Sequence, residues 1–272
     1  MNEKLTKPNA AARMPVVFVG HGSPMNAIED NRWSRGFRDL TASFPRPKAI
    51  LAISAHWYVR GTYLTGNSEP ETIHDFSGFP RALHEIRYPA KGHVDLAKRV
   101  RTLFGEEQAS LRTDWGLDHG TWSVLRWMYP EADVPVIQLS IDRRLREPAH
   151  FDMARSLAEL RDEGVLIVGS GNVVHNLGDV ISRMRSHDLV TPSWAREFDD
   201  TAKKAMEQRD TGTLLTIASE TEVGRMSHPS PDHWLPLIYA MGATDERDVA
   251  QFSSEGFDWG SLSMRNILFQ SV

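Results

Sequence analysis

The segment Val16-Val17-Phe18-Val19-Gly20-His21-Gly22-Ser23-Pro24-Met25 joins an apolar run to residues that cannot continue it. The first four residues are mostly β-branched and predict a strand that is buried on both faces. Glycines on both sides of His21 permit tight turns, and Pro24 has no backbone donor. We therefore expect the imidazole of His21 at the mouth of a buried strand, where it is placed to bind a metal ion or to move a proton.

A second strand repeats this arrangement. Ala49–Ile53 is an apolar run that leads into His56. Between the two strands, the three-to-four spacing of apolar residues in Asn31–Phe44 predicts a helix, stopped by the prolines that follow it. Strand, helix and strand make a βαβ unit with parallel strands. His21 and His56 should then emerge at the same carboxyl edge of the sheet, where open α/β sheets place their ligands.

A third strand ends in the same way in the second half of the chain. Val165–Val168 is apolar and continues through a glycine-rich stretch to His175. Later, Ser230 and Pro231 predict the N-cap and the first position of a helix that holds His233 in its first turn. Three strand-terminal histidines at one sheet edge favour a histidine-rich metal site. Neutral imidazoles suit non-haem iron(II) as well as a catalytic zinc, and the spacing does not choose between them.

The remaining segments complete one α/β domain. Further strands are predicted at Thr62–Thr65, Val134–Ile141 and, as an edge strand, Gly260–Met264, and further helices at Val94–Phe104, after Gly120 through Met128, and at Phe151–Asp162, Trp194–Gln208 and Gly212–Ala218. Histidines in polar or helical surroundings are expected on the surface; these are His84, His93, His150 and His187. With no repeat or linker, the chain is expected to form a single domain over residues 14–272 after a flexible tail over residues 1–13.

The amino-acid composition excludes several classes of function. At 272 residues, with 40% hydrophobic and 25% charged residues, the chain is typical of a globular protein with a full core. A net charge of −5 gives no basic field for nucleic acid or an anionic membrane. The absence of cysteine excludes disulfides, thiolate nucleophiles and iron–sulfur clusters. No apolar run approaches the ~18 residues of a spanning helix, and the polar N-terminus lacks the apolar core of a signal peptide. We expect a cytoplasmic enzyme.

Six motifs follow one another along the chain. They are Gly20–Met25, Ser54–Trp57, Ile73–Pro80, Asp118–Gly120, Gln138–Asp142 and Gly171–Asn176. In this order they resemble the 4,5-DOPA extradiol dioxygenase subfamily of the class III (LigB-like) extradiol ring-cleavage dioxygenases. The resemblance runs from Pro15 to about Met264. It implies a three-layer domain with a mostly parallel, mixed sheet flanked by helices. It also implies one mononuclear divalent metal, iron(II) in active enzyme and often zinc in purified protein.

The resemblance also assigns roles to the histidines. By position, His21, His56 and His233 match metal ligands. His175 matches the acid–base histidine of the wider family and is close enough to the metal to be a fourth ligand. The all-histidine set departs from the two-histidine, one-carboxylate face of many class III enzymes. Asp232 is an alternative carboxylate ligand, or a residue that complements the dipole of the predicted helix.

The implied reaction opens a catechol with O2 to a muconic semialdehyde. His175 is expected to take the catechol proton and return one later, while His119 orients the substrate or, alternatively, makes a loop hydrogen bond. The expected walls of the substrate pocket are Trp57, His74, Phe76 and Phe79.

Two other classes of function remain open at this point. A zinc-dependent hydrolase would use the same histidines around a water-bearing zinc. A non-catalytic binding protein of the Memo type would keep the fold and the histidines. The expected partners are a small catechol and O2, with no nucleic acid or membrane, in a monomer or small homo-oligomer.

Overall fold

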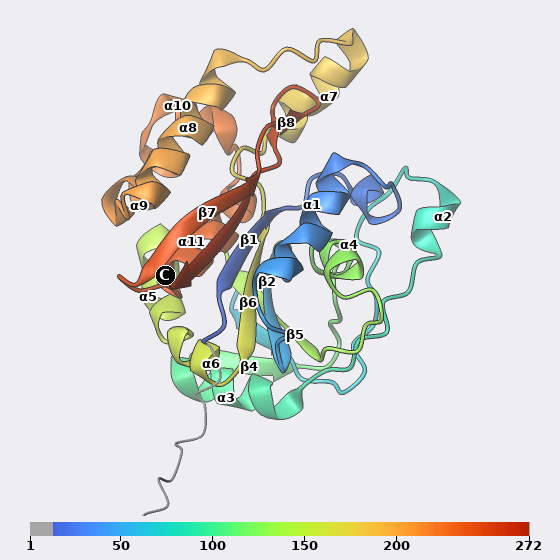
Figure 1. The fold of residues 1–272 in the computed structure, drawn as a ribbon, viewed down its shortest axis with the longest axis vertical. Helices are drawn as coiled ribbons and strands as arrows, with labels where there is room; N and C mark the ends of the chain where they lie inside the picture. Colours follow the sequence, from blue (N-terminus) through green and yellow to red (C-terminus); the bar gives the residue numbers. More distant parts are fainter. Residues whose placement is uncertain (1–12, 272) are drawn as a thin grey trace, which may run out of the picture.

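The computed structural model describes residues 13–271, so the tail expected over residues 1–13 lies, apart from Arg13, outside the described residues. At its centre is an eight-stranded sheet (Figure 1). In spatial order its strands are β4 (Ala109–Arg112), β3 (Thr62–Thr65), β5 (Val136–Asp142), β2 (Ala49–Val59), β6 (Val165–Gly171), β1 (Val16–Gly20), β10 (Asn266–Ser271) and β7 (Asp248–Ser254). A separate hairpin pairs β8 (Phe257–Asp258) with β9 (Leu262–Ser263).

The middle of the sheet is parallel and its edges are mixed. β1 pairs with β6, β6 with β2, and β2 with β5, all in parallel, which places the carboxyl ends of these strands at one edge. β10 is antiparallel to both β1 and β7, and β3 is antiparallel to β5. The predicted α/β domain with a mostly parallel, mixed sheet is confirmed.

Helices cover both faces of the sheet (Figure 1). One face packs against α1 (Arg32–Leu40), α2 (Arg81–His84), α4 (His119–Met128) and α7 (Leu177–Ser186). The other packs against α3 (Val94–Phe104), α5 (Glu147–Arg155), α6 (Ala158–Asp162), α8 (Ser193–Glu207), α9 (Thr211–Glu220) and α11 (Leu235–Gly242). The remaining helical segments are α10 (Glu222–Ser227) and the 3-10 turns η1 (Pro24–Ala27), η2 (Thr41–Ser43) and η3 (Pro231–His233). Among the described residues, no helix combines the length and apolar character needed to cross a membrane.

Alternate residues of β1 enter two separate cores. Val16 and Phe18 belong to the core on the α11 side, and Val17 and Val19 to the core on the α4 side, all four with no exposed surface. Burial on both faces explains why β1 is an unbroken apolar run rather than an alternating one.

The C-terminal edge of the sheet differs from the prediction. The edge strand expected over Gly260–Met264 is wrong, because only Leu262–Ser263 is extended and it pairs with β8, outside the main sheet. Trp259 and Gly260 have φ values of 48° and 80°, which turn the chain back between β8 and β9. The true edge strand is β7, which is hydrogen-bonded to β10.

Two predicted helices have different bounds in the structure. The helix expected over Phe151–Asp162 begins earlier, at Glu147, and is divided into α5 and α6 at Ser156. The helix expected to begin at Ser230 is preceded by η3, which holds His233, and the Ser230 side chain makes no capping hydrogen bond. His233 therefore lies in a separate turn ahead of α11.

Gly171, the last residue of β6, allows η3 to lie against the sheet. A Cβ atom on Gly171 would lie 2.2 Å from the carbonyl oxygen of His233. That carbonyl accepts a hydrogen bond from the Asn172 N–H at 3.1 Å. Pro236 has no N–H with which to extend the hydrogen bonds of α11 back across the turn. The position of His233 is thus set by the end of β6.

One histidine expected on the surface is in the core. His150 of α5 has no exposed surface, and its Nδ1 lies 3.0 Å from the hydroxyl oxygen of Tyr239 in α11. Burial lowers the pKa of His150 to about 4. The surface prediction for this residue is wrong, because its partner comes from a distant part of the chain.

We expect Gly171→Ala to destabilise the protein by roughly 1–3 kcal/mol, because the added methyl group must push η3 away from β6. Urea unfolding of the metal-free protein measures this difference. Gly178→Ala, in the first turn of α7, is the matched control, since the added Cβ would meet no atom closer than 3.4 Å and alanine favours helix. Equal stability of the two variants would contradict the close packing of η3 on β6.

The buried His150 should make stability depend on pH. The folded protein protonates this ring only below about pH 4, whereas the unfolded chain protonates it below the ordinary 6.5. Between these values the unfolded state holds the extra proton, so stability falls as the pH falls through this window. We expect His150→Gln to reduce the slope of unfolding free energy against pH by up to about 1.4 kcal/mol per pH unit. Urea unfolding at pH 7, 6 and 5 provides the slopes, and identical slopes would refute the assignment.

Candidate metal centre

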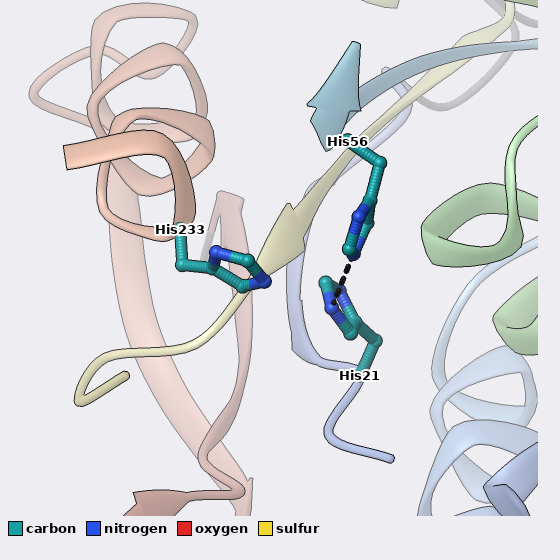
Figure 2. A group of neighbouring side chains, drawn as sticks. All are labelled: His21, His56 and His233. Atoms are coloured by element: carbon teal, nitrogen blue, oxygen red, sulfur yellow. Dashed lines mark hydrogen bonds between the residues drawn. The ribbon is translucent and has the colours of Figure 1, made fainter. Parts of the chain in front are cut away.

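Three histidines converge at the carboxyl edge of the sheet (Figure 2). His21 follows β1, His56 lies within β2, and His233 closes η3. One ring nitrogen from each lies within 4.8 Å of the others, and the Nε2 atoms of His21 and His56 are 3.2 Å apart. His21 and His233 are buried, while the His56 side chain keeps 21% of its surface exposed. We refer to this set as the three-histidine cluster.

β2 is longer than predicted, and this brings His56 into a strand. The strand runs to Val59, and its pairing with β5 is irregular between Ile53 and Tyr58. His56 lies in that irregular stretch. A break in strand register commonly redirects side chains near functional sites.

The tautomer of His21 follows from its hydrogen bonds. Its Nδ1 lies 2.9 Å from the Ser170 hydroxyl oxygen, and that hydroxyl donates to the Gly120 carbonyl at 2.5 Å. A serine hydroxyl has one hydrogen to donate, so Ser170 accepts from the Nδ1–H of His21. The Nε2 atom of His21 therefore carries a lone pair.

The other two rings have carboxylate partners. Nδ1 of His233 lies 2.7 Å from an oxygen of Asp232, and Nδ1 of His56 lies 3.3 Å from an oxygen of Asp75. The Asp232 carboxylate accepts the Nδ1–H of His233 and leaves Nε2 of that ring unprotonated. The Asp75 carboxylate faces Nδ1 of His56 as an ion-pair contact, and its negative charge favours a proton on that nitrogen. Hydrogen bonds of this kind orient metal-binding histidines and make them better ligands.

The electrostatics of the cluster keep its rings neutral. Burial, together with the neighbouring histidines, lowers the pKa of His21 and of His233 well below the ordinary 6.5. Burial and the neighbouring His119 lower the pKa of His56 to about 3. Neutral imidazoles are the form that binds a metal ion. Three of them, all with Nε2 available, fit zinc or iron(II) with further positions open for small molecules.

His175 lies beside the cluster rather than in it. Its ring stacks on His233 with centroids 3.4 Å apart and planes 2° from parallel. It belongs to neither of the groups whose potential ligand atoms gather within 4.8 Å among the described residues. Burial lowers the pKa of His175 to about 4, so its ring is neutral at pH 7.

His119 is the first residue of α4, not part of a loop as expected. Asp118 caps this helix by accepting a hydrogen bond from the Thr121 N–H. The ring of His119 lies 3.9 Å from that of His56, centroid to centroid. Its Nδ1 is 3.0 Å from the same Asp75 oxygen that faces His56. The Asp118 cap starts α4 at His119, and this position puts the His119 ring against the cluster.

Of the predicted pocket walls, two phenylalanines lie near the histidines. Phe76 meets the ring of His119 edge-on at 5.4 Å, and Phe79 meets Phe76 at 5.5 Å. Both side chains are half-buried. Phe76 thus lies against a histidine ring, and Phe79 is connected to the histidines only through Phe76.

The other two expected wall residues have different partners. The Nε2 of His74 lies 3.1 Å from the Ile86 carbonyl oxygen, which ties the ring to its own loop. Trp57 is 1% exposed and stacks on Trp115 with centroids 5.4 Å apart. The ring partners of Trp57 are other aromatic side chains, not the histidines of the cluster.

Sequence analysis did not single out Asp75, Ser170 or His228. Asp75 carries a signal, since it is an acidic residue inside one of the six motifs. Ser170 is a hydroxyl within a buried strand, which needs a partner. His228 is buried, with Nε2 2.8 Å from the Val173 carbonyl oxygen, and nothing in its local sequence predicts this.

Comparisons with known proteins agree with this geometry. Residues 16–269 match the family of the catalytic LigB subunit of aromatic ring-opening dioxygenase. The chain is 44% identical to the 4,5-DOPA dioxygenase extradiol of Escherichia coli K12, with 95% of each chain covered. It is 38% identical to the protein of that name from Beta vulgaris, with 94% of this chain and 96% of that one covered. The crystal structure of an uncharacterized Escherichia coli K12 protein, 41% identical, aligns with a TM-score of 0.81 over 94% of this chain and 99% of that chain.

We expect His233→Ala to weaken zinc binding strongly, because it removes a proposed ligand. Loss of a residue that only hydrogen-bonds to a ligand typically weakens metal binding by roughly 10–100-fold, and the loss in His233→Ala should be larger. The metal-free protein is titrated with Zn²⁺ against a chromophoric chelator, and circular dichroism checks that the fold persists. His187→Asn is the matched control, because His187 ends α7 with a φ of 56°, which asparagine tolerates. Unchanged affinity in His233→Ala would remove His233 from the ligand set.

Proposed function

The chain belongs to the family of the LigB catalytic subunit and is an extradiol ring-cleaving dioxygenase, and we propose that its substrate is a catechol of the 4,5-DOPA type. O2 opens the ring next to the hydroxyl pair and gives a muconic semialdehyde. The names of the relatives from Escherichia coli and Beta vulgaris support this substrate class. The half-buried Phe76 and Phe79 beside the cluster support a flat, aromatic ligand.

The observation that carries the proposal is the convergence of three neutral imidazoles with available Nε2 atoms. Extradiol dioxygenases of this family are metal-dependent, and we propose His21, His56 and His233 as the ligands. A divalent metal bound there supplies Lewis acidity and, as iron(II), the redox chemistry that O2 requires. Because the three ligands are neutral, they leave the positive charge of the ion uncompensated, which favours an anionic catechol oxygen. Zinc suits the same nitrogen donors.

Two further histidines are proposed to handle protons. His175 stacks on His233, one of the proposed ligands, so it is placed to take a proton from a catechol hydroxyl. This role is better supported than that of a fourth ligand, since its nitrogens lie outside the three-histidine cluster. His119 gives its Nδ1–H to Asp75, so its Nε2 is an acceptor. The Asp75 carboxylate would stabilise that ring if it became charged, as in an Asp–His pair.

The family and the named relatives disfavour the two alternative functions, a zinc hydrolase and a non-catalytic binding protein. An aromatic substrate and O2 are the partners of the reaction. The cytoplasmic location, the absence of nucleic-acid and membrane partners, and the monomeric or small oligomeric state stay predictions.

The test is a reconstitution assay. Metal-free protein is loaded with iron(II) without oxygen and then given L-DOPA and air, with zinc-loaded protein in parallel. We expect a yellow semialdehyde to form only with iron. The absence of colour with several catechols, in protein shown to hold iron, would refute the proposed substrate class.

The same assay measures the role of His175. Loss of a general base typically lowers the rate 10²–10⁴-fold, and we expect a loss of that size in His175→Gln. Its iron content, measured by a chelator assay, should match that of the parent protein, because its nitrogens lie outside the cluster. Loss of iron along with activity would instead make His175 a ligand.

A further inference from the structure

We propose that Asp75 is a positioning residue that fixes His56 and His119 together through one carboxylate. The inference rests on the proposed function, in which His56 binds the metal and His119 lies next to the substrate. One oxygen of Asp75 lies 3.3 Å from Nδ1 of His56 and 3.0 Å from Nδ1 of His119. The other oxygen accepts the backbone N–H of His119 at 2.9 Å.

The number of donors around Asp75 explains why a carboxylate is needed. Two N–H groups of His119 donate to this side chain, one to each oxygen, and Nδ1 of His56 faces the oxygen that accepts from the His119 ring. Both oxygens of an ionised carboxylate accept hydrogen bonds, so both His119 donors are satisfied while the negative charge stays close to Nδ1 of His56. An amide offers one accepting oxygen and places an NH2 group against the remaining donors. The carboxylate therefore selects the Nδ1–H tautomer in both rings at once.

Asp75 is presented by a segment that is fixed on two sides. The Ile73 N–H donates to the Leu117 carbonyl, and the Leu117 N–H donates to the Glu71 carbonyl, both at 2.8 Å. The indole N–H of Trp122 donates to the Ile73 carbonyl at 2.8 Å. These bonds connect the segment before Asp75 to the segment before His119. The position of the carboxylate is thus set independently of the metal.

The same atoms could be read as a second cation site, because His56, Asp75 and His119 place potential ligand atoms within 4.8 Å of one another. The protonation state that a second cation would require disfavours such a site. Nδ1 of His56 would have to bind the second ion while its Nε2 binds the first, which requires a doubly deprotonated imidazolate. The hydrogen bonds from His119 to Asp75 and the contact of Asp75 with His56 need only neutral rings. Metal stoichiometry separates the two possibilities.

The experiment compares the parent protein with Asp75→Asn and Asp75→Glu. Asp114→Asn is the matched control, since it removes a carboxylate that pairs with Arg112 at the surface. Metal-free proteins are titrated with Zn²⁺ for affinity and stoichiometry. Nitrogen-15 NMR of the histidine rings in the zinc-loaded proteins reports the Nδ1–H groups of His56 and His119.

We expect one zinc per chain, a roughly 10–100-fold weaker affinity in Asp75→Asn, and loss or displacement of both Nδ1–H signals in that variant. Asp75→Glu should restore part of each effect, and Asp114→Asn should change neither. An effect on one ring alone, or on none, would overturn the proposal. Binding of a second zinc that Asp75→Asn abolishes would replace it with a two-metal site. Neither readout depends on ring cleavage, so failure of the proposed substrate class would leave this test intact.

Discussion

The Nδ1–H of each histidine in the cluster must find an acceptor before its Nε2 is free for a metal ion. The groups that face these nitrogens come from three different places: Ser170 in β6 and Asp232 in η3 make hydrogen bonds, and the Asp75 carboxylate before α2 lies 3.3 Å from Nδ1 of His56. Because every ring is buried or partly buried, an unpaired Nδ1–H would be costly. The centre is therefore a property of the assembled fold rather than of the histidines alone.

Strand register is part of this constraint. In the parallel pairing of β1 with β6, Val19 lies opposite Ser170 and Gly20 opposite Gly171. This register brings the hydroxyl within reach of the ring of His21. A slip of one residue would turn the serine to the opposite face of the sheet. The apolar residues that bury β1 on both faces thus also hold His21, a proposed ligand, in its tautomer.

The proposed ligands come from the sheet edge and from η3. The parallel strands β1 and β2 carry His21 and His56 to one edge of the sheet, with β6 between the two strands. His233 approaches from outside the sheet, across the glycine that ends β6. The local signal at Ser230 and Pro231 indicates the start of a helix, yet it contains nothing about the contact with Gly171 that fixes the turn. Packing against β6, a distant segment of the chain, therefore fixes the turn that holds His233.

Sequence reasoning succeeded where the signal was local and continuous. The helix over Val94–Phe104 and the strand over Thr62–Thr65 have the predicted bounds. It missed β7 and β10, and β10 pairs with β1 from the other end of the chain. Asp75 was missed because its partners His56 and His119 belong to other segments of the chain, the second of them 44 positions away. His150 was misplaced because its hydroxyl partner lies 89 positions away.

The partners of β1 have a consequence for how the protein is made. β1 is the first strand of the described chain, but it hydrogen-bonds only to β6 and β10. Ser170, the acceptor for His21, is translated 149 residues later, a delay on the order of ten seconds on the ribosome. During that interval the apolar residues of β1 have no partner strand, so they are free to aggregate or to bind chaperones. His233, the last of the three proposed ligands, is made late in translation, so no fragment that ends before it contains the whole three-histidine cluster.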